Sequence, residues 1–272
     1  MVESYAMTDV GKVRSGNEDD FIRDDRFGVY VVSDGMGGHQ AGEVASQLVV
    51  STIRDYIKQY RNGEGDDKAF LEDYDNTLSE PANIVCNSIK LANRVVFNMS
   101  QKKADCKGMG ATAVVLAAFD DRIITANVGD SRIYLIRGKN IECLSRDHTL
   151  AYDQLHEKLI EKDEFEKSPY KNVLTRAVGV DEDIEPDVFE CQFLPGDRFL
   201  LCSDGLTKMV DESEIVEVVN RQKTPEKICR KLIGIANKNG GLDNITVLLL
   251  HFINVRFYWL RSFFFKLSRR GY

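Results

Sequence analysis

Several short motifs that mark common enzyme classes are missing from this chain of 272 residues. There is no glycine-rich phosphate loop ending in lysine, no H-E-x-x-H pair of zinc ligands and no G-x-S-x-G nucleophile elbow. The chain also contains only four histidines. The sequence therefore does not indicate a P-loop protein, a zincin or a serine hydrolase, and it favours chemistry that needs few histidines.

The six cysteines include no C-x-x-C pair, and no charged-then-apolar signal segment opens the chain. Residues 1–4 lead directly into a strand-like run instead. Scattered cysteines without a leader are typical of reduced thiols in a cytoplasmic protein. We therefore expect a cytoplasmic protein with several of its cysteines in the core.

Positive charge is scarce over most of the chain. The formal net charge is −7, although residues 252–272 carry five basic residues and no acid. The preceding 251 residues therefore hold a net charge of −12. No nucleic-acid partner is expected, because neutralising phosphates requires a basic surface, whereas an acidic body is compatible with metal binding.

Acidic residues are plentiful where apolar runs end. Two Ser-Asp-Gly junctions lie 170 residues apart, at Asp34-Gly35 and Asp204-Gly205. Taken singly, such pairs predict turns. Further acids stand at similar positions, and together the set offers the oxygen ligands that hard divalent cations prefer; these acids are Glu18, Asp19, Asp130 and Asp243.

The hydrophobic pattern predicts strands at 5–10, 28–33, 112–118, 123–128, 132–136, 198–203 and 244–252. Helices are expected at 40–60, 81–103, 211–220 and 225–238. Short turns join the strands expected between 112 and 136, which predicts a three-stranded antiparallel meander. The polar stretch 147–171 predicts a surface flap. Because the alternating rhythm of a parallel sheet is absent, we expect an α+β layered sandwich.

Seven short segments occur in a fixed order, at 8–21, 33–39, 110–113, 127–132, 172–179, 203–206 and 243–246. Over residues 5–251 they resemble the motifs of the metal-dependent serine/threonine protein phosphatases of type 2C (PPM), in the bacterial form. The resemblance implies a four-layer α-β-β-α sandwich, with two antiparallel sheets flanked by helix pairs. It also implies a catalytic domain at 1–251 with a flap at about 147–178, followed by a basic, aromatic tail at 252–272.

The resemblance implies a centre of two Mn²⁺ or Mg²⁺ ions. Asp34 would bridge them, with Glu18 and the Gly35 carbonyl on one ion and Asp204 and Asp243 on the other. Two ions at about 3.5–4 Å can share a bridging water and lower its pKa. The implied reaction is hydrolysis of phosphoserine and phosphothreonine in proteins by in-line attack of that bridging hydroxide.

Three more positions receive roles from the same resemblance. Asp130, with Asp204, would supply a third and weaker metal site, and Asp19 would orient metal-bound water. Arg14 would grip the substrate phosphate, for which a planar bidentate donor is suited. Arg14 and Asp34 are thus the expected catalytic residues.

The general acid stays open. Eukaryotic relatives have a histidine directly after the Asp-Gly of the second motif, where this chain has Met36. A water on the third metal is the preferred candidate, and His39 is the alternative. His148 has two interpretations as well: it either lies at the start of a flap helix capped by Asp147 or Thr149, which is favoured, or ligates metal.

The expected partners are phosphoserine and phosphothreonine proteins, including a serine/threonine kinase whose signalling the enzyme would reverse, and we expect a monomer. The tail at 252–272 is too charged to span a membrane. As a helix it could contact the anionic inner membrane surface peripherally; otherwise it folds back or docks to a protein. Two other classes remain: a catalytically silent binding module, and a regulator recruited to the membrane by the tail.

Overall fold

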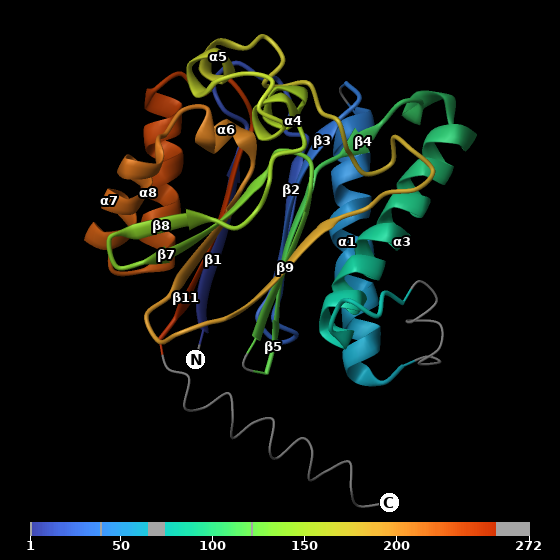
Figure 1. Ribbon diagram of the computed structural model, residues 1–272, viewed down its shortest axis with the longest axis horizontal. Helices are drawn as coiled ribbons and strands as arrows, with labels where there is room; N and C mark the ends of the chain where they lie inside the picture. The colour runs from blue at the N-terminus through green and yellow to red at the C-terminus, as the bar shows by residue number, and fades with distance from the viewer. Residues whose placement is uncertain (1, 39, 65–73, 121, 254–272) are drawn as a thin grey trace, which may run out of the picture.

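The computed structural model describes residues 2–38, 40–64, 74–120 and 122–253. Within them the chain forms two antiparallel sheets packed face to face, with helices on both outer sides (Figure 1). The first sheet has the order β1 (Val2–Asp9), β11 (Ile245–Phe252), β10 (Arg198–Cys202), β7 (Arg132–Arg137) and β8 (Asn140–Cys143). The second has the order β2 (Asp19–Asp24), β3 (Val29–Met36), β5 (Ala113–Phe119), β6 (Arg122–Val128) and β9 (Asp187–Gln192), with β4 (Gly110–Ala111) paired to β3.

Helix pairs cover the outer faces of both sheets. The second sheet is covered by α1 (Gln40–Asn62) and α3 (Glu80–Lys102), which is followed by the short helix η1 (Ala104–Cys106). The first sheet is covered by α7 (Glu212–Arg221) and α8 (Pro225–Lys238), next to the single turn α6 (Asp204–Thr207). The predicted fold class, an α+β sandwich of two antiparallel sheets flanked by helix pairs, is confirmed.

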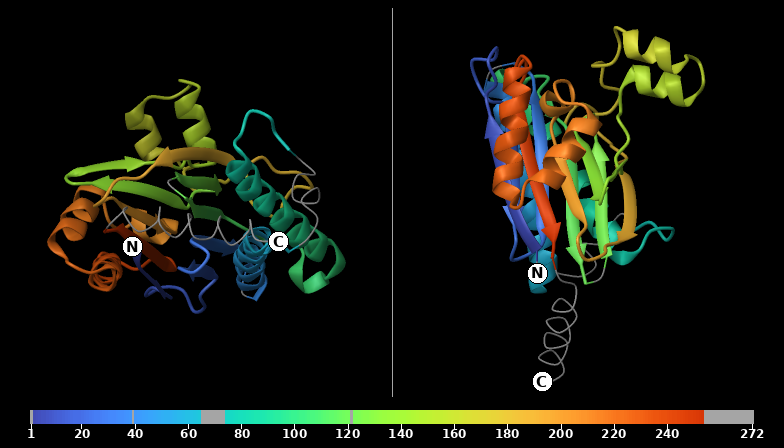
Figure 2. Two further views of the ribbon diagram at one scale, coloured as in Figure 1. Left: turned by 90° about the horizontal axis from the view of Figure 1, so that it is seen from below. Right: turned by 90° about the vertical axis from the view of Figure 1, so that its left-hand side faces the viewer.

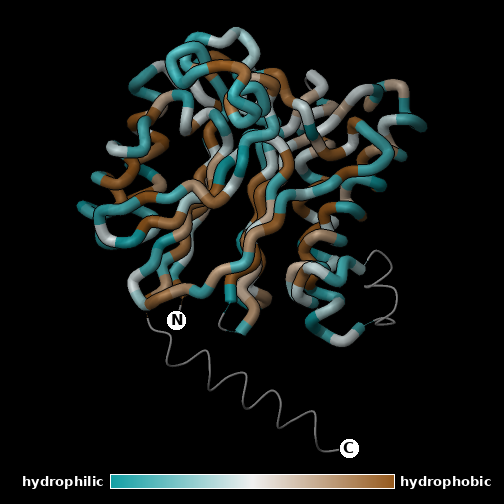
Figure 3. Tube along the Cα trace, in the orientation of Figure 1, coloured by the Kyte–Doolittle hydropathy of each residue, from teal (hydrophilic) through white to brown (hydrophobic). Residues whose placement is uncertain are grey.

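Three buried layers result from the alternation of side chains along the strands. In β3, Val29 and Val31 pack against α1 and α3, whereas Tyr30 and Val32 face the other sheet. All four are at most 1% exposed. Figure 3 shows the hydrophobic segments gathered in these strands. A strand buried on both faces explains why the run 28–33 reads as continuously apolar.

The segment between β8 and β9 carries two short helices, α4 (Leu150–His156) and α5 (Lys162–Lys167). They stand away from the sandwich (Figure 2) and are mostly hydrophilic (Figure 3). An isolated antiparallel bridge between Thr149 and Leu174 closes the segment at its base. Thr149 Oγ1 accepts a hydrogen bond from Tyr152 N and is the N-cap of α4, as predicted from the sequence.

The predicted meander of three strands is wrong in part. The strands β5 and β6 form an antiparallel pair, but β7 belongs to the other sheet, between β10 and β8. Both sides of β6 are already occupied, by β5 and β9. Gly129, at φ +96°, turns the chain from one sheet into the other directly after β6.

Four strands were not predicted, namely β2, β4, β8 and β9, because their sequences lack a long continuous apolar run. The first strand also begins earlier than expected, at Val2. It pairs along its full length with β11, so that Val2 lies opposite Phe252. The proposed tail therefore starts in a strand residue, and its remaining part, apart from Ile253, lies outside the described residues.

All six cysteines are free, and four are buried: Cys86, Cys106, Cys202 and Cys229. This confirms the prediction that several cysteines lie in the core. Across the described ranges, no helix is long and apolar enough to cross a membrane.

Candidate active site

Acidic side chains from both sheets come together at one edge of the sandwich, near the ends of several strands. Asp34 lies near the end of β3, and Asp19 lies opposite it in β2. Burial raises the pKa of Asp34 well above its usual value, and the charges of Asp19, Asp204, Asp130 and Asp243 raise it further. Contacts agree with this, since Asp19 is paired with Asp34 across the strands and the amine of Lys208 reaches both Asp204 and Asp243. These acids, with Asp130, form one centre.

Glu18 joins this centre through tight backbone packing. Gly35 N donates a hydrogen bond to Glu18 O at 3.1 Å. Gly42, in the first turn of α1, packs against both residues. A Cβ at Gly35 would lie 2.1 Å from Gly42 O, and one at Gly42 would lie 2.5 Å from Glu18 Oε2. The two glycines therefore allow strand, helix and carboxylate to meet without a gap.

Asn244 holds the loop that carries Arg14 and Glu18 against the other sheet. Its Oδ1 accepts a hydrogen bond from Glu18 N at 2.8 Å, and its Nδ2 donates to Val10 O and Gly16 O. The sequence did not predict this role, although the asparagine belongs to the motif at 243–246.

Asp19 links the two sheets beneath the centre. Its Oδ2 accepts hydrogen bonds from Ser203 Oγ and Thr246 Oγ1, both at 2.7 Å, while its buried Oδ1 has no partner. Burial raises the pKa of Asp19 to about 7, although these two hydrogen bonds act in the opposite direction. One oxygen of Asp19 is thus structural, and the other is left without a protein donor.

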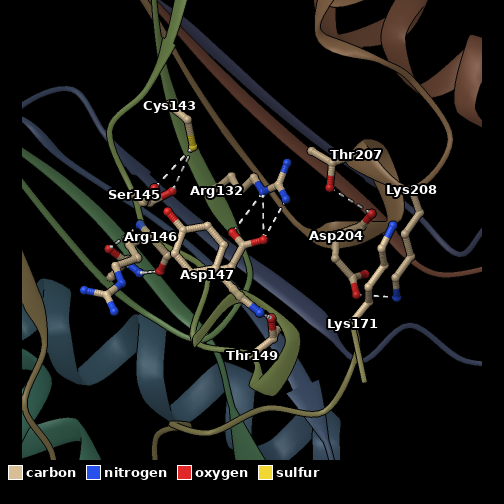
Figure 4. A network of polar contacts seen from close by, with 12 residues as sticks. Arg132, Cys143, Ser145, Arg146, Asp147, Thr149, Lys171, Asp204, Thr207 and Lys208 are labelled. Atoms are coloured by element: carbon tan, nitrogen blue, oxygen red, sulfur yellow. Dashed lines mark hydrogen bonds and ion pairs between the residues drawn. The ribbon is translucent and has the colours of Figure 1, made fainter. Parts of the chain in front are cut away.

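Two cations stand beside the acids of the first sheet. Arg14 contacts both oxygens of Asp243, with Nε at 2.9 Å from Oδ1 and Nη2 at 3.1 Å from Oδ2. Lys208 Nζ forms an ion pair with Asp204 Oδ2 and lies 3.6 Å from Asp243 Oδ2. Figure 4 shows the amine of Lys208 directed at the Asp204 carboxylate. The role of Lys208 was not predicted from the sequence.

Asp130 lies two residues after the end of β6, close to the same acids. Burial raises its pKa to about 7, and repulsion from Asp204 and Asp147 adds to this effect. The neighbouring Asp147 is neutralised by a fork of hydrogen bonds from Arg132, with Nε and Nη2 at 2.9 and 2.6 Å from its oxygens (Figure 4).

His148 contacts the turn that carries Asp130, and each of its ring nitrogens lies near a protein group. Its Nδ1 accepts a hydrogen bond from Gly129 N at 3.2 Å, and its Nε2 lies 3.3 Å from Asp187 Oδ2. The backbone of His148 also binds Gly129 O and Thr175 N. These contacts connect the Asp130 turn to the base of the segment with α4 and α5, which the sequence did not reveal. Met36 ends β3, and His39 lies outside the described residues.

The chemistry of this centre fits hard divalent cations. All the groups proposed here as metal ligands are carboxylate or carbonyl oxygens. Among them and their neighbours, buried oxygens of Asp19 and Asp204 have no hydrogen-bond partner. As they stand, no three His, Cys, Asp or Glu side chains of the described residues are spaced to hold one ion. In the structure Asp243 forms an ion pair with Arg14, and Asp204 forms one with Lys208. Binding an ion would therefore require local movement of side chains.

Comparison with known proteins agrees with the fold. The family model "Protein phosphatase 2C" matches residues 6–245. The serine/threonine phosphatase stp of Listeria monocytogenes is 37% identical over 246 residues, which cover 89% of this chain and 93% of the relative. The serine/threonine phosphatase of S. agalactiae has a TM-score of 0.79 and 32% identity, covering 93% of this chain and 100% of its own.

A further solved structure is the catalytic domain of the serine/threonine protein phosphatase PstP, in complex with two manganese ions. It has a TM-score of 0.75 and 28% identity, and the match covers 93% of this chain and 99% of that one.

Together with the two-sheet sandwich, these similarities define the class of protein, a protein phosphatase. The chain belongs to the protein phosphatase 2C family, a metal-dependent family, and is by membership a protein-serine/threonine phosphatase.

Proposed function

We propose that this phosphatase hydrolyses phosphoserine and phosphothreonine in proteins with the help of two Mn²⁺ or Mg²⁺ ions. Glu18 and the Gly35 carbonyl would hold one ion, Asp204 and Asp243 the other, and Asp34 both. When bound, the ions would supply hydroxide from a water shared between them as the nucleophile for in-line attack. The observation that carries the proposal is the group of partly buried carboxylates, in which buried oxygens of Asp19 and Asp204 have no hydrogen-bond partner.

Arg14 is proposed to bind the substrate phosphate. Its side chain is 53% exposed and lies at the rim of the centre, beside Asp243. A guanidinium in this position can keep one contact to Asp243 and offer its remaining N–H groups to phosphate oxygens. Arg14 would thus orient the phosphorus toward the acidic centre.

Asp19 and Asp130 are proposed to act around the main pair of ions. The partnerless Oδ1 of Asp19 would accept a hydrogen bond from water and orient it. Asp130, together with Asp204, would form the third and weaker metal site. A water at that site is our preferred general acid, with His39 as the alternative.

The wider role is also a proposal. We infer a monomeric, cytoplasmic enzyme that opposes a serine/threonine kinase in bacterial signalling. The proposed division is a catalytic domain at 1–251, with residues 147–178 as the flap, and a tail at 252–272. The tail would contact the inner membrane surface peripherally, with folding back or docking to a protein as the alternative.

The test is release of phosphate from a phosphothreonine peptide, with Mn²⁺ or Mg²⁺ and with EDTA, for the wild type and Asp34→Asn. We expect turnover that needs the metal and is lost in the variant. Asp55→Asn is the matched control, since Asp55 lies on α1 and pairs only with the neighbouring Arg54 among the ion pairs described. Absence of turnover in a folded wild type would overturn the proposal and favour a silent binding module.

A further inference from the structure

Lys208 is the charged side chain in the centre that the proposed mechanism does not use. It follows the single turn α6, and its backbone N–H donates to Asp204 O, so that the two residues are one helical turn apart. Its Nζ contacts Asp204 Oδ2 and lies 3.6 Å from Asp243 Oδ2. One ammonium group therefore touches both carboxylates that would hold the same metal ion.

The electrostatic setting explains why a cation is stable there. The side chain of Asp204 is only 13% exposed, and burial raises its pKa while Lys208 lowers it. Several like charges surround it, because Asp34, Asp130 and Asp243 belong to the same centre. Removing the ammonium group would leave these buried carboxylates to repel one another without that counter-ion.

The position of Lys208 also allows it to leave. Its side chain is 30% exposed, and a lysine has a flexible four-carbon stem. Arg14 differs, because its described contacts are to Asp243 and not to Asp204. Lys208 is thus the cation positioned to exchange with an ion at the pair Asp204 and Asp243.

We propose that Lys208 is an internal counter-ion that competes with a divalent metal for Asp204 and Asp243. It stabilises the metal-free centre and weakens metal binding, because an incoming ion must first displace the ammonium group. The enzyme therefore responds to the concentration of free metal over a higher range than the carboxylates alone would set. The inference rests on the proposed assignment of Asp204 and Asp243 as metal ligands.

The experiment measures Mn²⁺ binding to metal-stripped protein, through loss of the electron paramagnetic resonance signal of free Mn²⁺. Lys208→Met keeps the apolar stem and removes the charge. Lys208→Arg keeps the charge. Lys90→Met is the matched control, since Lys90 is a half-buried lysine on α3 with a 2.9 Å ion pair to Glu185. Asp204→Asn tests the ligand assignment itself.

We expect Lys208→Met to bind Mn²⁺ about tenfold more tightly than the wild type, a moderate effect for a partly exposed ion pair. In EDTA the same variant should melt at a lower temperature, because the buried carboxylates have lost a counter-ion. Lys208→Arg and Lys90→Met should bind Mn²⁺ like the wild type. A lysine with a merely structural role would not strengthen metal binding when removed.

Three outcomes decide the matter further. If Asp204→Asn loses Mn²⁺ binding but Lys208→Met binds no more tightly than the wild type, the competition is overturned and the ligand assignment survives. If Asp204→Asn binds Mn²⁺ like the wild type, the ligand assignment fails and the competition fails with it. Should Lys208→Met not fold in EDTA, Lys208→Gln takes its place, and unchanged binding in that variant overturns the proposal equally.

Discussion

The strand β10 has an aspartate with buried oxygen atoms near each end, and the two differ in how those oxygens are bonded. Asp197, just before the strand, is 1% exposed and fully bonded. Arg137 donates to both of its oxygens at 2.7 Å, and Leu194 N donates to Oδ2 at 2.7 Å. Asp204, just after the strand, has a buried Oδ1 without a hydrogen-bond partner.

The difference separates an acid that supports the fold from one that we propose binds a ligand. Burying a charge is costly unless it is paired and hydrogen-bonded. Asp197 meets that condition with protein groups alone, and it fixes the turn that leads into β10. Asp204 meets it only in part, which is the situation expected for a side chain completed by something that is not protein.

The largest effect is expected at the functional end of the strand. Asp204→Asn should reduce phosphatase activity by about 10²-fold or more, because it removes a proposed metal ligand and a charge of the centre. Its metal-free stability should stay equal or rise, since one of the repelling carboxylates is neutralised. Activity assays and thermal melting in EDTA give both numbers. Loss of stability without loss of activity would show that the two acids had been assigned the wrong way round.

The second effect concerns the structural end. Asp197→Asn should lower the free energy of unfolding by about 2 kcal/mol, because an amide cannot accept from Arg137 on both atoms. The activity of the folded fraction should match that of the wild type. Urea unfolding, followed by assays under native conditions, tests this. A strong loss of activity at full stability would contradict the structural role.

A smaller effect is expected at the rim of the centre. Arg14→Ala should raise KM for a phosphothreonine peptide by about tenfold, which corresponds to about 1.4 kcal/mol of binding. Arg14→Lys should recover only part of this, since an ammonium group cannot form the bidentate contact. Steady-state kinetics at saturating metal measures the change. An unaltered KM in both variants would argue that Arg14 serves only Asp243.

The smallest effect comes from removing the cation at the structural end. Arg137→Met should cost about 1 kcal/mol, since the arginine is 49% exposed, so that water can replace it beside Asp197, whose bond from Leu194 N remains. The loss should be the same with and without Mn²⁺, whereas Lys208→Met should lose stability only without the metal. Thermal melting of both variants in EDTA and in Mn²⁺ makes this comparison. A metal-dependent loss in Arg137→Met would remove the distinction between the two ends.

The sequence indicated which acids lie near strand ends, since short segments such as Asp34-Gly35 and Asp204-Gly205 are local signals. Their roles as metal ligands stay a prediction. Helices were predictable from local signals too: the helix expected at 225–238 matches α8 residue for residue. The fold class followed from the order of the elements and from the family resemblance.

What the sequence could not predict depends on contacts between distant residues. The strand β7 lies next to β10, whereas β9, which begins 55 residues further along the chain than β7, pairs with the other side of β6. The contacts of Asn244 with residues 10–18 and of His148 with Gly129 are of the same kind. In the sequence Lys208 cannot be distinguished from a surface lysine. Its contact with Asp204 depends on the single turn α6, which brings the two residues together.

The tight meeting of Gly35, Gly42 and Glu18 has a consequence for mutational libraries. A scan restricted to acidic positions would find Glu18 and overlook the two glycines. Yet any other residue at 35 would meet Gly42 O at 2.1 Å, and a side chain at 42 would collide with the Glu18 carboxylate. In a selection for active clones, all three positions should drop out together, and relaxing one of them should require a second change that moves the start of α1.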